Sequence, residues 1–211
     1  MIENASTRGA RILLWLGALI FFAGLQSAQG PLIAAESEQL TAGNLLVASN
    51  EMKDPRFFES VLYLVKHDAE GTLGLIINRP MAKGPIDDLL QGLGAEATGS
   101  PVDIIIHYGG PVSSRQGFLL HSDDQTLQSS LKSPNGIAMT SDTKMIQAIA
   151  AGAGPRQFLF AVGYAGWAPG QLEEELKANS WFVVPADKEL IFGKDAAEKW
   201  RRALDKRQIR L

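Results

Sequence analysis

The sequence has 211 residues, of which 45% are hydrophobic and 20% charged, and its formal net charge is −3. These values are ordinary for a folded soluble domain and give no electrostatic case for nucleic-acid binding. The chain contains no cysteine, which excludes disulfides, thiolate zinc sites and a cysteine nucleophile.

The first 35 residues have the pattern of a secretory signal. Arg8 and Arg11 precede an apolar, charge-free run at 12–25, and small residues follow it. We expect cleavage after Ala35 and a periplasmic protein. An uncleaved inner-membrane anchor is the alternative, because no charge occurs over 12–35. A mis-called start codon, with translation beginning near Leu40, would instead leave a cytoplasmic protein.

After a linker at 36–42 we expect one domain over 43–205 and a basic tail at 206–211. Apolar and β-branched runs predict strands, and a four-residue loop ending in Gly71 predicts a hairpin between the second and third of them. The predicted strands are 44–49, 61–67, 72–78, 102–107, 117–122, 137–140, 157–162, 181–184 and 189–192.

Helices are predicted between these strands. One covers 86–93, Ser141 caps one that runs to about residue 151, and Pro169 opens one that ends near Asn179. Asp195 and Glu198 resemble a capping box for a last helix that turns Trp200 and Leu204 inward, and residues 56–60 form a short helical turn. Because strands and helices do not alternate strictly, we expect an α+β fold. It is a single compact domain with a mixed, strongly curved β-sheet flanked by helices, preceded by an N-terminal apolar helix.

The segment 163–181, GYAGWAPGQLEEELKANSW, follows a buried-looking strand. We interpret it as a turn at two glycines that exposes Tyr164 and Trp167 before the chain enters a helix at Pro169. With DPRFFESVLYLVKH (54–67), GTLGLIINRP (71–80) and YGGPVSSRQGFLLH (108–121), this segment resembles the YqgE/AlgH family of bacterial proteins.

The resemblance implies an irregular α+β domain over about residues 40–205. It also implies a family without an assigned reaction, which has been connected with transcriptional control of exopolysaccharide production. Family members typically begin close to the block at 43–49, so the N-terminal extension of this chain departs from the pattern.

The titratable residues suggest neither a metal nor a cofactor. The three histidines, His67, His107 and His121, are dispersed and lack zinc-ligand spacing, so each is expected to close a strand by a hydrogen bond. Ser113 follows a Gly-Gly-Pro turn and could face His121 across a hairpin, but no aspartate is placed to orient that histidine. We therefore assign no catalytic residue.

A small-ligand site can nevertheless be assembled from the turns. The glycine turn at Gly109 and Gly110 could point backbone N–H groups at an anion, or simply allow positive φ. Aromatic rings after the 157–162 strand could stack on a ligand, or belong to the core. The candidate ligand-binding residues are Arg79, Gly109, Gly110, Ser113, His121, Tyr164 and Trp167. Arg115 is a further plausible functional cation, whereas Glu173–Glu175 and the basic C-terminal helix are interpreted as solvated faces.

Three functions follow in decreasing order. The first is a non-enzymatic accessory or regulatory protein that acts on a protein partner through a surface near 163–181. The second is a small-ligand-binding protein or hydrolase-like enzyme with a site at the 109–121 and 163–167 turns. Direct DNA-binding regulation comes last, because the sequence has no helix-turn-helix pattern or basic recognition helix, and a membrane partner is expected only if the N-terminal segment is uncleaved.

Overall fold

The computed structural model describes residues 40–208. The predicted signal peptide or anchor at 1–35, its apolar helix, part of the linker and the last residues of the tail lie outside this range. Within it, no helix is long and apolar enough to cross a membrane.

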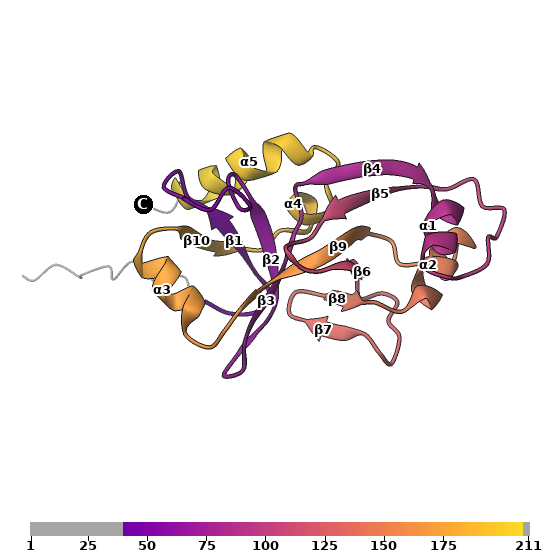
Figure 1. Ribbon diagram of the computed structural model, residues 1–211, viewed down its shortest axis with the longest axis horizontal. Helices are drawn as coiled ribbons and strands as arrows, with labels where there is room; N and C mark the ends of the chain where they lie inside the picture. The colour runs from indigo at the N-terminus through magenta and orange to yellow at the C-terminus, as the bar shows by residue number, and fades with distance from the viewer. Residues whose placement is uncertain (1–39, 209–211) are drawn as a thin grey trace, which may run out of the picture. The chain divides into compact units, whose positions relative to one another are not determined.

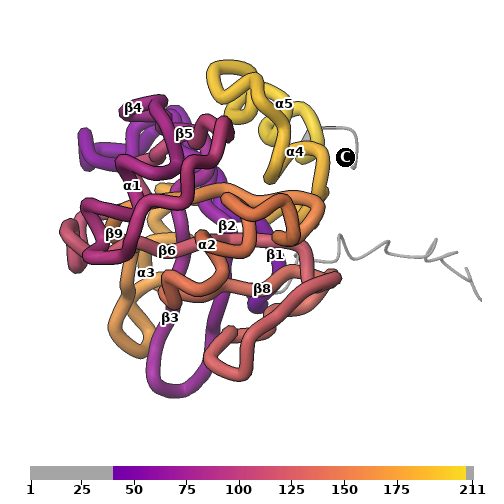
Figure 2. Tube along the Cα trace, turned by 90° about the vertical axis from the view of Figure 1, so that its right-hand side faces the viewer, coloured from indigo at the N-terminus to yellow at the C-terminus, as the bar shows by residue number. Residues whose placement is uncertain are grey.

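Ten strands form a single sheet over this part of the chain, in the order β10-β1-β2-β3-β9-β6-β8-β7, and β5 pairs with both β9 and β4. All neighbouring strands are antiparallel except β5 and β9, which are parallel. The fold is therefore α+β with a mixed sheet, as predicted, and Figures 1 and 2 show the sheet curling strongly. The strands are β1 (Asn44–Ala48), β2 (Val61–Asp68), β3 (Gly71–Ile76), β4 (Pro80–Pro85), β5 (Asp103–Tyr108), β6 (Val112–Ser122), β7 (Leu131–Ser133), β8 (Ile137–Thr140), β9 (Phe158–Trp167) and β10 (Trp181–Pro185).

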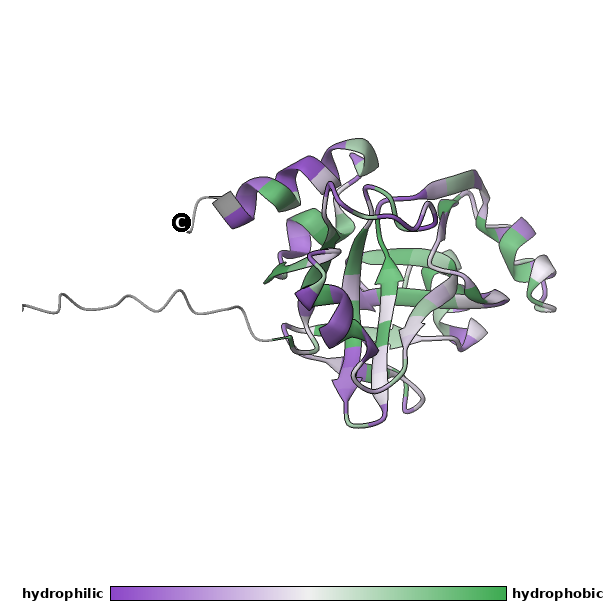
Figure 3. Cartoon of the chain, turned by 60° about the vertical axis from the view of Figure 1, so that its left-hand side comes forward, coloured by the Kyte–Doolittle hydropathy of each residue, from purple (hydrophilic) through white to green (hydrophobic). Residues whose placement is uncertain are grey.

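Over residues 40–208, five helices pack around this sheet, and three hydrophobic clusters lie between them and the strands. Alternate residues of β1 enter different clusters, because successive side chains of a strand point to opposite faces. One cluster contains residues of α4 and α5, the second contains Leu172 of α3, and the third lies against α1 and α2. Figure 3 shows apolar residues along the strands and hydrophilic ones on outward helix faces. The helices are α1 (Ile86–Gly92), α2 (Thr143–Ala150), α3 (Gln171–Lys177), α4 (Lys188–Phe192) and α5 (Ala196–Gln208).

Strand β9 changes its neighbour at Gly163. Up to Val162 it runs parallel to β5, and from Ala165 it pairs with β3. Gly163 has φ +73°, and a Cβ there would collide with the carbonyl oxygen of Gly110. Gly110 is equally constrained, because its own Cβ would meet the backbone of Tyr164. The two glycine segments therefore cross in direct backbone contact, which only glycine permits.

Two predicted boundaries around this crossing are wrong. Strand β9 does not stop at the glycines but continues through Trp167, because its second half finds β3 as a new partner. Helix α3 begins after Gly170, which is left-handed, rather than at Pro169. The segment 163–167 is therefore strand, where the sequence predicted an exposed turn.

Three other local predictions are corrected. Residues 189–192 belong to α4 and not to a strand, because Asp187 accepts a hydrogen bond from the Glu189 N–H and caps the helix. Asp142 caps α2 in place of Ser141. Residues 56–59 form turns without a helix.

Candidate functional site

The largest irregularity of the sheet lies in β6. Val112 pairs with Tyr164 and Gly117 with Val162, so an advance of five residues along β6 matches two along β9, and β6 carries three extra residues. This bulge begins at Ser113, which holds a left-handed backbone with φ +50° that is uncommon for a residue other than glycine. Bulges of this kind are frequent next to functional sites.

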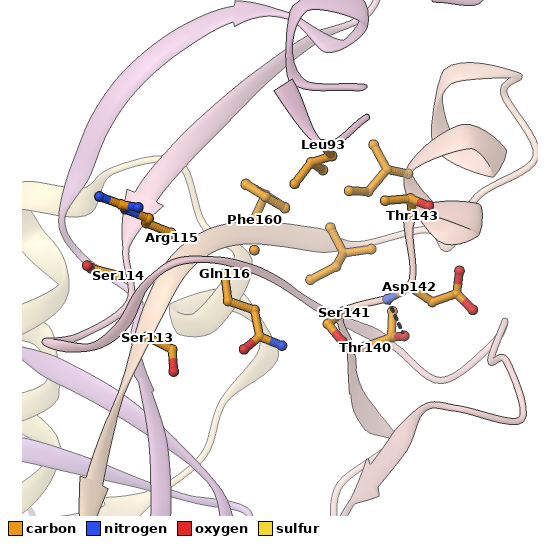
Figure 4. A pocket seen from close by; sticks show the side chains of 13 residues that line it. Leu93, Ser113, Ser114, Arg115, Gln116, Thr140, Ser141, Asp142, Thr143 and Phe160 are labelled. Atoms are coloured by element: carbon orange, nitrogen blue, oxygen red, sulfur yellow. Dashed lines mark hydrogen bonds between the residues drawn. The ribbon is translucent and has the colours of Figure 1, made fainter. Parts of the chain in front are cut away.

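The bulge forms one wall of a cavity of about 690 Å³, which we call the bulge pocket. The opposite wall is the segment from Thr140 to Thr143 at the start of α2, as Figure 4 shows. The floor is apolar and comes from Leu93, Leu119, Ile146 and Phe160. A cavity of this size with an apolar floor and several hydroxyl groups has the dimensions and mixed lining of a small-molecule site.

Two charged residues line the bulge pocket, and they differ in their partners. The Asp142 carboxylate accepts hydrogen bonds from the Lys144 N–H at 3.0 Å and the Ser129 hydroxyl at 3.3 Å. Arg115 lies at the edge of the cavity with its side chain directed away from α2 (Figure 4). Its guanidinium makes no ion pair or hydrogen bond with any residue that the structure describes. Arg115 is therefore free to meet a solute.

Of the predicted ligand-binding residues, Ser113 is the one that lines the bulge pocket. The Gly109 N–H donates to the Val162 carbonyl at 2.8 Å, and its own carbonyl accepts from Ile76 at 3.0 Å. These hydrogen bonds, and the close packing of Gly110 on Tyr164, show that the glycines are needed here because two backbone segments cross in contact. An anion-binding nest would require free N–H groups there.

His121 and Arg79 both serve the fold where the structure places them. His121 lies at the far end of β6 from Ser113 and is fully buried, with its Nδ1 2.8 Å from the Ser122 carbonyl oxygen and its Nε2 unpaired. Burial lowers the pKa of its imidazole below the usual value. Arg79 donates from both terminal nitrogens to the carbonyls of Arg56 and Phe58, at 2.6 and 2.5 Å. It thereby closes the loop between β1 and β2.

Tyr164 is half-buried and Trp167 almost fully buried, and both rings pack against other aromatic side chains instead of standing exposed in a turn. The Tyr164 ring packs edge-on against Phe118, with centroids 5.7 Å apart. Trp167 is 6% exposed and packs edge-on against Trp181 and near Phe57, with centroids 6.0 and 6.3 Å away. The seven predicted residues therefore do not converge on one pocket.

A second cavity opens beside these tryptophans. This tryptophan cavity has a volume of about 350 Å³. It is lined by Met52, Lys53, Asp54, Arg56, Phe57, Pro111, Val112, Gly166, Trp167, Gln171, Glu175, Ser180 and Trp181.

Glu175 of α3 is the organised polar group of the tryptophan cavity. One carboxylate oxygen, Oε2, accepts both indole N–H groups, from Trp167 at 3.0 Å and from Trp181 at 2.7 Å. The other, Oε1, accepts the Gln171 amide at 3.0 Å. The sequence predicted a solvated face for Glu173–Glu175, and Glu175 departs from it because the chain returns past β9 and β10 to bring both indoles to α3.

An exposed apolar side chain lines the same cavity, and a second one adjoins its lining in the sequence. Val112, on its lining, is 37% exposed, and Phe58, directly after Phe57, is 52% exposed. We call the tryptophan cavity together with Phe58 the tryptophan face. Exposed aromatic and aliphatic side chains next to a preformed cavity are typical of protein-interaction surfaces.

Lys199 is a buried cation that sequence reasoning missed. It is 1% exposed, and its ammonium donates to the carbonyls of Ile77 at 2.9 Å and Ile191 at 2.7 Å. Burial lowers the pKa of Lys199 to about 8. A signal was present, because position 199 shares a helix face with Ala203 at the i+4 spacing. The other basic residues of α5 made the whole helix look solvent-exposed, so the sequence did not single out Lys199.

His107 lines a further cavity of about 370 Å³, and His67 of β2 pairs with Thr72 of β3 next to their hairpin turn. His107 Nδ1 is 3.1 Å from the Phe160 carbonyl oxygen, and His67 Nδ1 is 2.7 Å from the Thr72 hydroxyl. Burial, followed by smaller effects that include the Lys199 charge, lowers the pKa of His107. Over residues 40–208, no three His, Asp or Glu side chains gather in a metal-binding arrangement.

Comparison with known proteins places this fold in a family. The family model described as AlgH-like, DUF179, matches residues 45–211, so the chain belongs to the AlgH-like family, as the sequence blocks predicted. A UPF0301 protein of Afipia carboxidovorans is 42% identical over 172 residues, covering 78% of this chain and 82% of the relative. One from Rhodospirillum rubrum is 38% identical over 174 residues, covering 82% and 91%.

Two solved structures share the fold. The solution structure of the AlgH protein from Pseudomonas aeruginosa is 38% identical, with a TM-score of 0.68, and the match covers 78% of this chain and 87% of that one. The crystal structure of protein DIP2367 from Corynebacterium diphtheriae is 20% identical, with a TM-score of 0.64 over 78% and 86% of the chains. The second likeness concerns the fold alone.

Proposed function

We propose that this AlgH-like protein is a non-enzymatic accessory protein that binds a partner protein through the tryptophan face. One observation carries the proposal: a cavity lined by Trp167 and Trp181 also has the exposed Val112 on its lining, and the exposed Phe58 follows its lining residue Phe57 in the chain. The surface lies at the segment 163–181 and the loop before β2, both of which belong to the blocks that define the resemblance.

The physical argument rests on what such a surface gains by being covered. Removing an aromatic and a branched aliphatic side chain from water contributes roughly 25 cal/mol per Å² of apolar area. A rigid cavity beside them supplies a pocket for an anchor residue, the usual centre of an interface hot spot. The indole–Glu175 bonds hold the floor in place, so little ordering is needed on binding.

The experiment places a photo-crosslinking amino acid at Val112 in the full chain, expressed in its own host. The matched control is Leu131, which is 40% exposed on β7 and lies outside the tryptophan face. We expect a discrete adduct from Val112 and none from Leu131. The adduct is identified by mass spectrometry, and the partner is purified for direct titration.

That titration decides the proposal. Phe58→Asp and Val112→Asp should each weaken binding by at least about tenfold, the range of hot-spot substitutions, whereas Leu131→Asp should leave it unchanged. Equal binding by all three variants would refute a partner site at the tryptophan face.

A second function is favoured by the bulge pocket, namely the binding of a small molecule between β6 and α2. Deleting residues 114–116 removes the three extra residues and lets β6 pair continuously with β9. We expect this variant to fold and to lose saturable binding of small fragments detected by NMR in the wild type. Fragment binding that survives the deletion would rule out the bulge pocket.

A further inference from the structure

The chemistry of the tryptophan cavity narrows the kind of partner it fits. Four charged residues line it: Lys53, Asp54, Arg56 and Glu175. Asp54 and Arg56 neutralise each other through an ion pair of 2.6 Å with several hydrogen bonds. Lys53 is exposed to solvent. Glu175 is half-buried, and its three bonded donors, two indoles and an amide, are all neutral.

Glu175 is thus a carboxylate fixed in position without a cation. Over residues 40–208 it forms no salt bridge. An ionised carboxylate offers about four acceptor positions, of which Oε2 uses two and Oε1 one. One acceptor position on Oε1 is left, on a group that lines a cavity.

The neighbouring rings suit the same kind of ligand. Phe57, Trp167 and Trp181 line the cavity around Glu175, and their faces attract cations within about 6 Å of the ring centre. Their centroids are 5.4 to 6.3 Å apart, so the rings form one cluster, and the Arg56 guanidinium already lies over the Phe57 ring, 5.8 Å from its centroid. Aromatic faces combined with a carboxylate are a recurring way to recognise an ammonium or guanidinium group.

We propose that the tryptophan cavity receives a basic side chain, lysine or arginine, from the partner protein. This inference rests on the proposed function. Its cationic head meets Glu175 Oε1, and its methylene stem lies along the aromatic rings. Phe58 and Val112 then contact apolar residues that flank the basic one. The partner is therefore a protein segment that presents an exposed lysine or arginine between apolar side chains.

The test uses two small probes with the full chain, butylguanidinium and its neutral counterpart 1-pentanol. Binding is followed through the indole N–H signals of Trp167 and Trp181 in ¹H–¹⁵N NMR spectra. Trp200 is an internal reference, because it does not line the tryptophan cavity and its indole donates to the Ala48 carbonyl. We expect saturable shifts of the Trp167 and Trp181 signals with butylguanidinium, and at least about fivefold weaker binding of pentanol.

Two glutamate substitutions test whether Glu175 is the carboxylate that binds the cation. Glu175→Gln keeps an oxygen for the indoles and should weaken butylguanidinium binding by at least about fivefold, whereas Glu174→Gln on the solvent side should not. If Glu175→Gln fails to fold, Lys53→Glu at the cavity rim decides, because an added negative charge should tighten binding about twofold. Equal binding of both probes, or no shift of either indole, would overturn the inference.

The partner surface at the tryptophan face and the basic anchor residue can each be refuted without refuting the other. Loss of partner binding in Val112→Asp without any cation binding leaves the partner surface standing and removes the basic anchor. Cation binding to Trp167 and Trp181 with partner binding unaffected by Phe58→Asp and Val112→Asp leaves the cation site and removes the tryptophan face as the partner surface.

Discussion

Gly163 illustrates how one residue determines the path of the sheet. Its left-handed backbone lets β9 leave β5 and pair with β3, while its missing side chain makes room for Gly110. Gly152 has the same φ of +73°, but a Cβ there would meet open space. Substitutions at Gly163 and Gly152 therefore separate the cost of backbone strain from the cost of steric collision.

We predict that Gly163→Ala lowers the free energy of unfolding by at least about 3 kcal/mol, because strain and collision add. Gly152→Ala should cost about 1 kcal/mol, the penalty of a left-handed alanine alone. Urea unfolding followed by tryptophan fluorescence measures both. Equal losses would mean that the glycine crossing tolerates a side chain.

Lys199 links stability to pH in a direction unlike that of a surface lysine. Its folded pKa of about 8 lies below the ordinary value of 10.5, so between these values the unfolded chain binds more protons than the folded one. Stability contributed by this group therefore rises with pH over that window. Below pH 8 both states are protonated, and the full burial penalty is present.

From pH 8 to 9.5 this group should raise the free energy of unfolding by roughly 1.5 kcal/mol. Lys199→Met should lack the rise, while Lys206→Met, at a partly exposed ion pair with Asp187, should keep it. Measurements stay below pH 10, because burial raises the pKa of Tyr63 and its titration would act in the opposite direction. A parallel pH profile for wild type and Lys199→Met would contradict the role of this amine.

At the scale of elements, helix α2 begins with a cap that the sequence placed one residue early. Asp142 accepts the Lys144 N–H and satisfies one of the unpaired donors of the first turn. Ser141 lines the bulge pocket instead. Both residue types are good caps, so local preference alone could not choose between them.

We predict that Asp142→Ala costs about 1 kcal/mol of unfolding free energy, as loss of a helix cap usually does, and that Ser141→Ala is close to neutral. Chemical denaturation of both variants at neutral pH provides the measurement. A larger loss from Ser141→Ala than from Asp142→Ala would restore the predicted cap.

At the scale of the whole molecule, we propose that the N-terminal segment directs export of the domain. The charge-free run over 12–35 after Arg8 and Arg11 predicts a signal peptide. We expect the mature protein to begin at Glu36 and to be recovered from the periplasmic fraction of its host. Edman sequencing and cell fractionation check this. A cytoplasmic protein that begins near Leu40 would support the mis-called start codon.

Much of the fold was predictable, because hydrophobic periodicity is a local property of the chain. The hairpin of β2 and β3, helix α1 and the apolar half of β9 were all predicted from such runs. Residues 189–192 were not, because four apolar-rich residues suit a strand or a helix equally and the Asp187 cap decides. Ser113 and Trp167 were the predicted site residues found on cavity linings, and they line different cavities, since pockets depend on which distant segments face each other.

The sequence by itself determined the family, the α+β class and most of the strands, because these follow from composition, short-range pattern and recognisable blocks. Tertiary structure alone decided that Trp167 is buried, that Glu175 is held between two indoles and that Lys199 lies in the core. It also decided that three extra residues in β6 open a cavity against α2. Each of these depends on contacts between segments far apart in the chain, whose geometry is set by how the curled sheet brings its strands and helices together.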